Sequence, residues 1–87
     1  MTTYYLVGEN AYGGEPDVWL FSDKDVALKT YREYLTYRRE EAEFPNTPET
    51  EIYYSPEDDT PWIMSAAYNE DGDYIWVQRI ELDAGIR

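Results

Sequence analysis

Short apolar segments separated by turn residues divide the chain into five predicted strands. Residues 2–7, 17–21, 52–54, 62–68 and 74–82 are rich in β-branched and aromatic residues, as strands are. The last segment alternates, with one side formed by Tyr74, Trp76, Ile80 and Leu82 and the other by Ile75, Val77, Arg79 and Glu81. This period of two is typical of a strand whose two sides meet different surroundings.

Residues 17–21 are apolar on both sides, with Val18 and Leu20 on one and Trp19 and Phe21 on the other. A strand that is apolar on both sides is typical of the middle of a sheet, so the pattern predicts a central strand. Residues 8–16 contain three glycines and a proline, which predict a loop between the first two strands.

One helix is predicted between the second and third strands. Its apolar face recurs at helical spacing and consists of Ala27, Leu28, Tyr31, Tyr34 and Leu35. Ser22 is the predicted N-cap, with Asp25 three residues further on as in a capping box. We expect the helix to end near Glu43, because Pro45 and Pro48 follow.

The element order β-β-α-β-β-β predicts an α+β fold in one domain over residues 1–87. We expect a small antiparallel sheet of four or five strands with one helix packed on one face. Residues 69–73 are the predicted hairpin turn, with Gly72 available for a positive φ. A single helix covers a single face, so the other face must stay solvated or meet a partner, and a homodimer through it is one option.

The net charge of −12 comes almost wholly from residues 40–78, which hold eleven carboxylates and no Lys, Arg or His. This charge opposes binding to nucleic acid and to anionic membranes, and it favours a basic partner, a cation or a high-salt environment. The chain has no Cys, which excludes disulfides. No signal peptide is visible and the apolar runs are too short to span a membrane, so a cytoplasmic location is expected.

The residue types give no support to catalysis. The chain has no His and no Cys, which removes most general bases and the strongest nucleophiles, and no carboxylate pair stands out by its spacing. We therefore expect no enzyme, no catalytic residue and no cofactor. Acidic residues surround Gly72, but they lack the twelve-residue calcium pattern, so no metal site is expected either.

A carboxylate surface that enters a basic cleft built for phosphates is the leading hypothesis for function. Alternate residues of a strand lie about 6.5–7 Å apart, close to the phosphate repeat of an extended nucleic-acid strand, and Glu49/Glu51 and Asp71/Asp73 have this spacing. The predicted acidic contact residues are Glu49, Glu51, Glu57, Asp58, Asp59, Glu70, Asp71 and Asp73, with Tyr53, Tyr54 and Trp62 as aromatic anchors. Of these, the 57–59 loop is expected to contribute most to the association rate. The alternative interpretation is a solvated acidic face that only keeps the protein soluble.

Pro61 and Trp62 open a strand that leads to the acidic, glycine-containing turn at residues 69–73, and this resembles part of the uracil-DNA glycosylase inhibitors. In length, charge and absence of Cys the chain resembles the small acidic inhibitors of phages, which include anti-CRISPR and anti-restriction proteins. The resemblance implies a non-enzymatic DNA mimic that inhibits a nucleic-acid-binding defence protein in the host cytoplasm. It transfers no functional residue. The alternative is a small acidic interaction domain of a salt-adapted organism, without mimicry.

Overall fold

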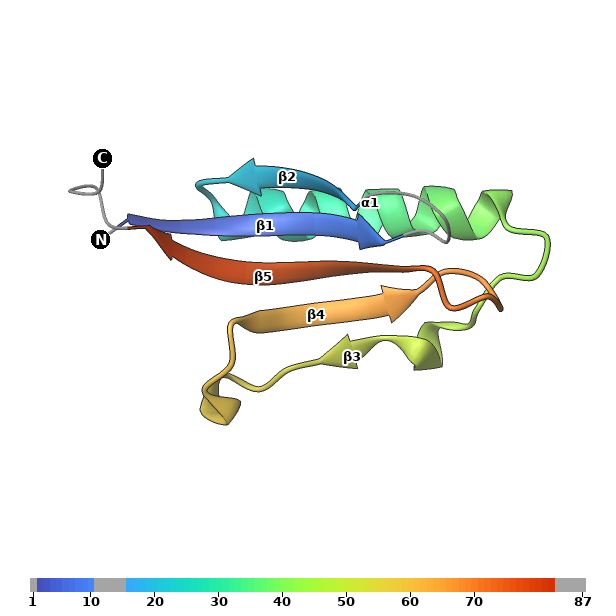
Figure 1. Ribbon diagram of the computed structural model, residues 1–87. Coiled ribbons are helices and arrows are strands. Elements are labelled where there is room, and N and C mark those ends of the chain that lie inside the picture. Colours follow the sequence, from blue (N-terminus) through green and yellow to red (C-terminus); the bar gives the residue numbers. More distant parts are fainter. Residues whose placement is uncertain (1, 11–15, 83–87) are drawn as a thin grey trace.

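The computed structural model describes residues 2–10 and 16–82, which form one helix and a five-stranded sheet (Figure 1). The elements are β1 (Thr2–Asn10), β2 (Asp17–Phe21), α1 (Lys24–Glu41), β3 (Ile52–Tyr53), β4 (Trp62–Ala67) and β5 (Tyr74–Leu82). Two single-turn 3-10 helices, η1 (Pro48–Thr50) and η2 (Pro56–Asp58), flank β3. The predicted α+β class and the predicted order β-β-α-β-β-β are both confirmed.

The sheet is antiparallel throughout, with the strand order β2-β1-β5-β4-β3. Its centre is the pair formed by β1 and β5, which runs from Thr2 opposite Leu82 to Asn10 opposite Tyr74. Figure 1 shows α1 lying behind β1 and β2, and the helix packs on β1, β2 and β5. β3 therefore lies beyond the helix, whereas β4 still contributes Ala66 to the core beneath it.

The prediction that residues 17–21 form a central strand is wrong, because β2 lies at an edge of the sheet. Its two apolar sides have two different causes. Trp19 lies on the helix side, where its ring centroid is 5.1 Å from that of Tyr34. Val18 and Leu20 lie on the opposite side and remain exposed. The pattern thus indicated two apolar surfaces, of which the described residues cover the one that faces α1.

The helix begins one residue later than predicted, since Asp23 and not Ser22 is the N-cap. The Asp23 carboxylate accepts hydrogen bonds from the backbone N–H of Asp25 at 2.8 Å and of Val26 at 3.4 Å. Asp caps a helix as well as Ser does and adds a negative charge at the positive end of the dipole. The helix ends at Glu41, two residues before the predicted end, and Ala42 is its C-cap.

The core lies between the sheet and the predicted apolar face of α1. Ala27, Tyr31 and Leu35 are buried there, and Leu28 and Tyr34 pack against them. The sheet contributes Val7, Ala66, Tyr68, Ile75 and Val77. Helical spacing therefore predicted the buried side of α1 correctly.

The loop predicted for residues 8–16 is wrong in its first part, because β1 continues to Asn10. Gly8 and Asn10 pair with β5, and Glu9 is buried at 3% exposure beneath the helix. Residues 11–15 of the predicted loop lie outside the described residues. The turn at 69–73 is confirmed, and Gly72 has a φ of +86°.

The sheet face turned away from α1 carries no charged side chain among the described strand residues. Strand alternation places there every second residue of each strand, starting from the contact of Trp76 with Gly8. We call this surface the open face; its members are Thr2, Tyr4, Leu6, Gly8, Asn10, Val18, Leu20, Ile52, Trp62, Ser65, Ala67, Tyr74, Trp76, Gln78, Ile80 and Leu82.

Position 8 requires a glycine, because the indole of Trp76 lies directly over it. A Cβ atom on residue 8 would overlap with the Cζ2, Cη2 and Cε2 atoms of the Trp76 ring. The ring also contacts Trp62 and Tyr74, with centroid distances of 6.3 and 5.6 Å. The packing of Trp76 with Trp62 and Tyr74 on the open face thus depends on the absence of a side chain at Gly8 in the neighbouring strand, β1.

We expect Gly8→Ala to destabilise the protein by about 1–3 kcal/mol, because the Trp76 ring must move out of its packed position. Urea unfolding followed by circular dichroism measures this loss. In a Trp76→Ala background the same substitution should cost much less, since the overlapping ring is gone. An equal loss in both backgrounds would show that the overlap is not the cause.

Candidate functional site

Exposed carboxylates gather at one end of the molecule, where α1 ends and the turn between β4 and β5 begins (Figure 1). The backbone N–H of Glu70 donates to the Phe44 carbonyl at 3.0 Å, and the side-chain amide of Asn46 donates to the carbonyl of Asn69. These bonds hold the segment after the helix against the turn. We call this end the acidic end; its exposed carboxylates are Glu40, Glu41, Glu43, Glu49, Glu70 and Asp71.

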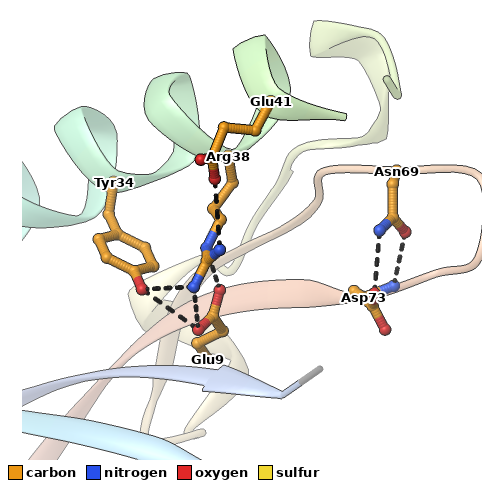
Figure 2. Close-up of polar contacts among 6 residues, drawn as sticks. All are labelled: Glu9, Tyr34, Arg38, Glu41, Asn69 and Asp73. Atoms are coloured by element: carbon orange, nitrogen blue, oxygen red, sulfur yellow. Dashed lines mark hydrogen bonds and ion pairs between the residues drawn. The ribbon is translucent and has the colours of Figure 1, made fainter. Parts of the chain in front are cut away.

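Arg38, a base at this end, is turned inward toward the buried carboxylate of Glu9 (Figure 2). Its Nε lies 2.7 Å from Glu9 Oε2, and its Nη2 donates to Glu9 Oε1 at 3.1 Å. The Tyr34 hydroxyl accepts from Nη2 at 2.8 Å and donates to Glu9 Oε1 at 3.3 Å. Glu9 therefore obtains its counter-charge and a hydrogen bond from two residues that are one helical turn apart.

The protonation of this cluster follows from its contacts. Burial lowers the pKa of Arg38, but the hydrogen bonds with Glu9 and Tyr34 outweigh burial and hold the pKa above its ordinary value. Burial, together with the nearby charges of Glu9 and Asp73, raises the pKa of Tyr68 to about 12. The guanidinium of Arg38 lies 5.1 Å from the ring centroid of Tyr34 and 6.0 Å from that of Tyr68.

Arg39, the neighbouring base, is also engaged in holding the fold. Its Nη2 donates to the carbonyls of Thr47 and Ala67 at 3.0 and 3.1 Å and to the hydroxyl of Thr50 at 3.0 Å. Arg39 thereby joins the end of α1 to η1 and β4. Both bases of the helix end are directed at buried or main-chain acceptors. Of the exposed carboxylates, Glu41 lies 3.4 Å from Arg38 Nη1. A hydrogen bond with Thr47, together with the charge of Arg39, lowers the pKa of Glu49.

The turn that presents Glu70 and Asp71 is closed by its own side chains. Asn69 donates from its amide to the Asp73 carboxylate at 2.9 Å and accepts from the Asp73 backbone N–H at 3.2 Å (Figure 2). The backbone N–H of Gly72 donates to the Asn69 carbonyl at 3.2 Å. Asp73 thus shapes the turn, and the two carboxylates between it and Asn69 are exposed.

The spacing argument for phosphate mimicry is wrong for both predicted pairs. Glu49 belongs to η1, and Glu51 caps that turn and accepts from the Tyr31 hydroxyl at 3.1 Å. Asp71 and Asp73 lie in a turn, where alternate residues do not point the same way. A hydrogen bond with Thr47 lowers the pKa of Glu49. Of the four carboxylates, Glu49 and Asp71 are exposed, whereas Glu51 and Asp73 have structural partners.

The predicted loop at Glu57, Asp58 and Asp59 lies far from the acidic end, at the corner where η2 leads into β4 (Figure 1). All three carboxylates are exposed, and Asp59 ends η2 with a φ of +50°. We call this segment the acidic loop. The acidic contact residues predicted from the sequence therefore do not form one surface but fall into two groups at different ends.

The predicted aromatic anchors all border one hollow near the acidic loop, although the Trp62 ring contacts Trp76 on the open face. Tyr53, Tyr54 and Trp62 line a shallow hollow of about 150 Å³ on the part of the sheet that extends beyond the helix. Lys24 and Arg79 line it as well. These two bases offset the neighbouring carboxylates, so the acidic loop is electrostatically less one-sided than the acidic end.

Glu40, Glu41 and Glu43 are not among the predicted contact residues, although they belong to the acidic segment 40–78. Their nearness to Glu70 depends on backbone hydrogen bonds between residues 44–46 and 68–70. Glu9 was missed as well. Its signal was its place two residues after Val7 on the buried side of β1.

In the described ranges 2–10 and 16–82, no three acidic residues form a group that could hold a metal ion. The helix in this part of the chain is not long and apolar enough to cross a membrane. No family model matches the chain, and neither the curated proteins nor the solved structures include a significant match.

We expect Arg38→Met to cost about 3–5 kcal/mol of unfolding free energy, because it leaves the Glu9 carboxylate buried without its counter-charge. Adding Glu9→Gln should recover a large part of this loss. Urea unfolding measures both. The control is Arg32→Met, which removes an exposed base from the same helix and should change stability by less than about 0.5 kcal/mol. Equal losses for Arg38→Met and Arg32→Met would contradict the role assigned to the ion pair.

The raised pKa of Tyr68, about 12, predicts a loss of stability at alkaline pH. The folded state holds the phenol proton more tightly than the unfolded chain does, whose tyrosines have a pKa of about 10. The contribution is therefore complete below pH ~10 and is lost as the pH rises from about 10 to about 12. Thermal melts across this range should show a shallower decline for Tyr68→Phe than for the wild type. Tyr53→Phe, at an exposed position, is the control and should follow the wild type.

Proposed function

We propose that this protein is a non-enzymatic binding protein that presents its acidic end to the basic surface of a nucleic-acid-binding protein and thereby inhibits it. The main support for this proposal is that Arg38 and Arg39 point into the fold, toward Glu9 and main-chain carbonyls. Six exposed carboxylates at the acidic end therefore have no exposed base beside them in the described sequence. A basic cleft that binds phosphates attracts such a surface by the same long-range electrostatics.

The proposal rests on charge density and not on a phosphate-like register. The carboxylates come from the end of α1, from η1 and from the turn before β5, so their spacing follows the packing of three segments. A cleft for a flexible nucleic-acid strand selects for negative charge within a confined area, and it does not need a regular repeat. Net charge of the same sign as nucleic acid opposes direct binding to DNA or RNA, so the partner is a protein.

The resemblance to small acidic phage inhibitors supports the same class of function. The chain shares with them its length, its acidity, the absence of Cys and an α+β sheet. Such an inhibitor works in the cytoplasm of a bacterial host, where anti-restriction and anti-CRISPR targets operate. Absence of His and Cys is in keeping with a role that depends on binding and not on catalysis.

The acidic end ranks above the acidic loop as the contact surface. Lys24 and Arg79 lie beside the hollow that borders the loop and reduce its field. At the acidic end, burial of Glu9 and capture of main-chain carbonyls occupy the two bases of the helix end. The loop nevertheless has neighbouring aromatic residues, so the two surfaces are tested side by side.

Three variants that each remove three negative charges separate the surfaces. The acidic-end variant carries Glu40→Gln, Glu43→Gln and Glu70→Gln. The acidic-loop variant carries Glu57→Gln, Asp58→Asn and Asp59→Asn. The control variant carries Asp17→Asn, Asp25→Asn and Glu33→Gln, exposed residues of β2 and α1.

We expect the wild type to capture basic, nucleic-acid-binding proteins from a bacterial lysate at low salt, and added DNA to release them. The acidic-end variant should lose most of this capture, at least about tenfold, mainly through slower association. The control variant should keep it. Loss confined to the acidic-loop variant would place the contact at the hollow instead. Equal capture by all variants, or capture that DNA does not reverse, would contradict the proposal.

A further inference from the structure

The open face is an apolar surface that α1 cannot cover, because the helix lies on the other side of the sheet. Val18, Leu20, Ile52 and Leu82 are each exposed on it by about half, and Trp62 and Tyr74 by about two-fifths. Exposed apolar side chains gathered on one face in this way often mark a protein–protein contact surface. Its extent follows from strand alternation and not from one stray side chain.

Two polar side-chain pairs of the open face form hydrogen bonds within the face itself. The indole Nε1 of Trp76 donates to the Oε1 of Gln78 at 2.9 Å. The side-chain amide of Asn10 donates to the Tyr74 hydroxyl at 3.2 Å. These two pairs keep their hydrogen bonds when the surface is covered, which reduces the cost of removing them from water.

The charge pattern of β5 also indicates that the open face is a contact surface. Its last residues place Arg79 and Glu81 on the helix side and Ile80 and Leu82 on the open face. An ordinary two-layer domain directs apolar residues toward its helix and charged residues toward water. Here the sheet keeps charge off the face that has no helix, although the chain carries a net charge of −12.

We propose that the open face binds a second copy of this chain, so that two sheets pack face to face as a symmetric dimer. A basic partner would find no carboxylate on this face among the described residues. Two copies of a strongly acidic chain repel each other, and they repel least when they meet through a surface without charges. A two-fold axis places the same apolar patch on both sides of the contact, which makes the face its own complement.

The size of the face suits a stable dimer. β1 and β5 have nine residues each, whereas β2, β3 and β4 have five, two and six. At about 3.4 Å per residue along a strand and about 4.8 Å between strands, they cover a flat area of roughly 500 Å². Protruding side chains such as Trp62 and Leu20 add accessible surface beyond this flat projection. A standard interface buries about 800 Å² on each partner, and two sheets pack about 10 Å apart.

Sedimentation equilibrium at increasing protein concentration tests the dimer directly. We expect the wild type to exceed its monomer mass of 10.3 kDa and to approach twice this value at high concentration. Association should strengthen between 0.01 M and 0.1 M salt, because the Debye length falls from about 30 Å to about 10 Å and screens the repulsion. A wild type that stays at the monomer mass at all concentrations and at both salt levels would overturn the proposal.

Leu20→Lys is the decisive variant, because it places a charge in the face at a side chain that is 51% exposed in the monomer. It also lowers the net negative charge, so weaker association cannot be ascribed to added repulsion. We expect the dimer dissociation constant to rise at least about tenfold. Val26→Lys is the matched control, since Val26 is 47% exposed on α1 and lies off the face. It should dimerise as the wild type does.

The other possible outcomes of these experiments also support or overturn the dimer. Circular dichroism shows whether each variant folds, and Val18→Lys, at a similarly exposed position on β2, replaces Leu20→Lys if that variant does not. Trp62 and Trp76 should shift their fluorescence to shorter wavelength with protein concentration only in chains that dimerise. A dimer that withstands both lysine substitutions, or that Val26→Lys disrupts equally, would show that another surface is used and would overturn the proposal. These measurements use no partner protein and are independent of the proposed inhibitory function.

Discussion

The buried carboxylate of Glu9 and its neutralisation by Arg38 connect the sheet to the second half of the helix. Glu9 lies on the helix side of β1, at 3% exposure, where an unpaired charge would cost several kcal/mol. Arg38 and Tyr34 reach it from consecutive turns of α1, which fixes the rotation of the helix over the strand. β1 continues past Gly8, against the sequence-based expectation of a loop, and the ion pair neutralises the carboxylate that this continuation buries.

The same ion pair also determines the character of the surface. A base that neutralises a buried acid cannot neutralise an exposed one, so the helix end loses Arg38 as a counter-charge for Glu40, Glu41 and Glu43, apart from its 3.4 Å contact with Glu41. Arg39 acts likewise toward main-chain carbonyls. The acidity of this end is thus a consequence of how the core is closed, in addition to the local composition.

The sequence predicted the elements because their signals are local. Alternation located β4 and β5 to within a residue, and helical spacing identified the buried positions Ala27, Tyr31 and Leu35. It did not predict what depends on distant contacts. An apolar strand such as β2 looks central when both of its sides are apolar, and only the topology shows that one side is uncovered. The grouping of Glu43 with Glu70 likewise depends on hydrogen bonds between segments about 25 residues apart.

Charge and apolar surface are separated in this fold, and the separation limits how two copies can pack. The carboxylates of the acidic end lie beyond the strand ends and on the helix terminus, whereas the open face lies on the opposite side of the sheet. Stacked sheets can have their acidic ends together or at opposite ends. Within about 10 Å, the Debye length at 0.1 M salt, two such ends repel strongly. In the proposed dimer, repulsion therefore favours a two-fold axis perpendicular to the strands in the plane between the sheets, which would place the acidic ends at opposite ends, each accessible to the proposed partner.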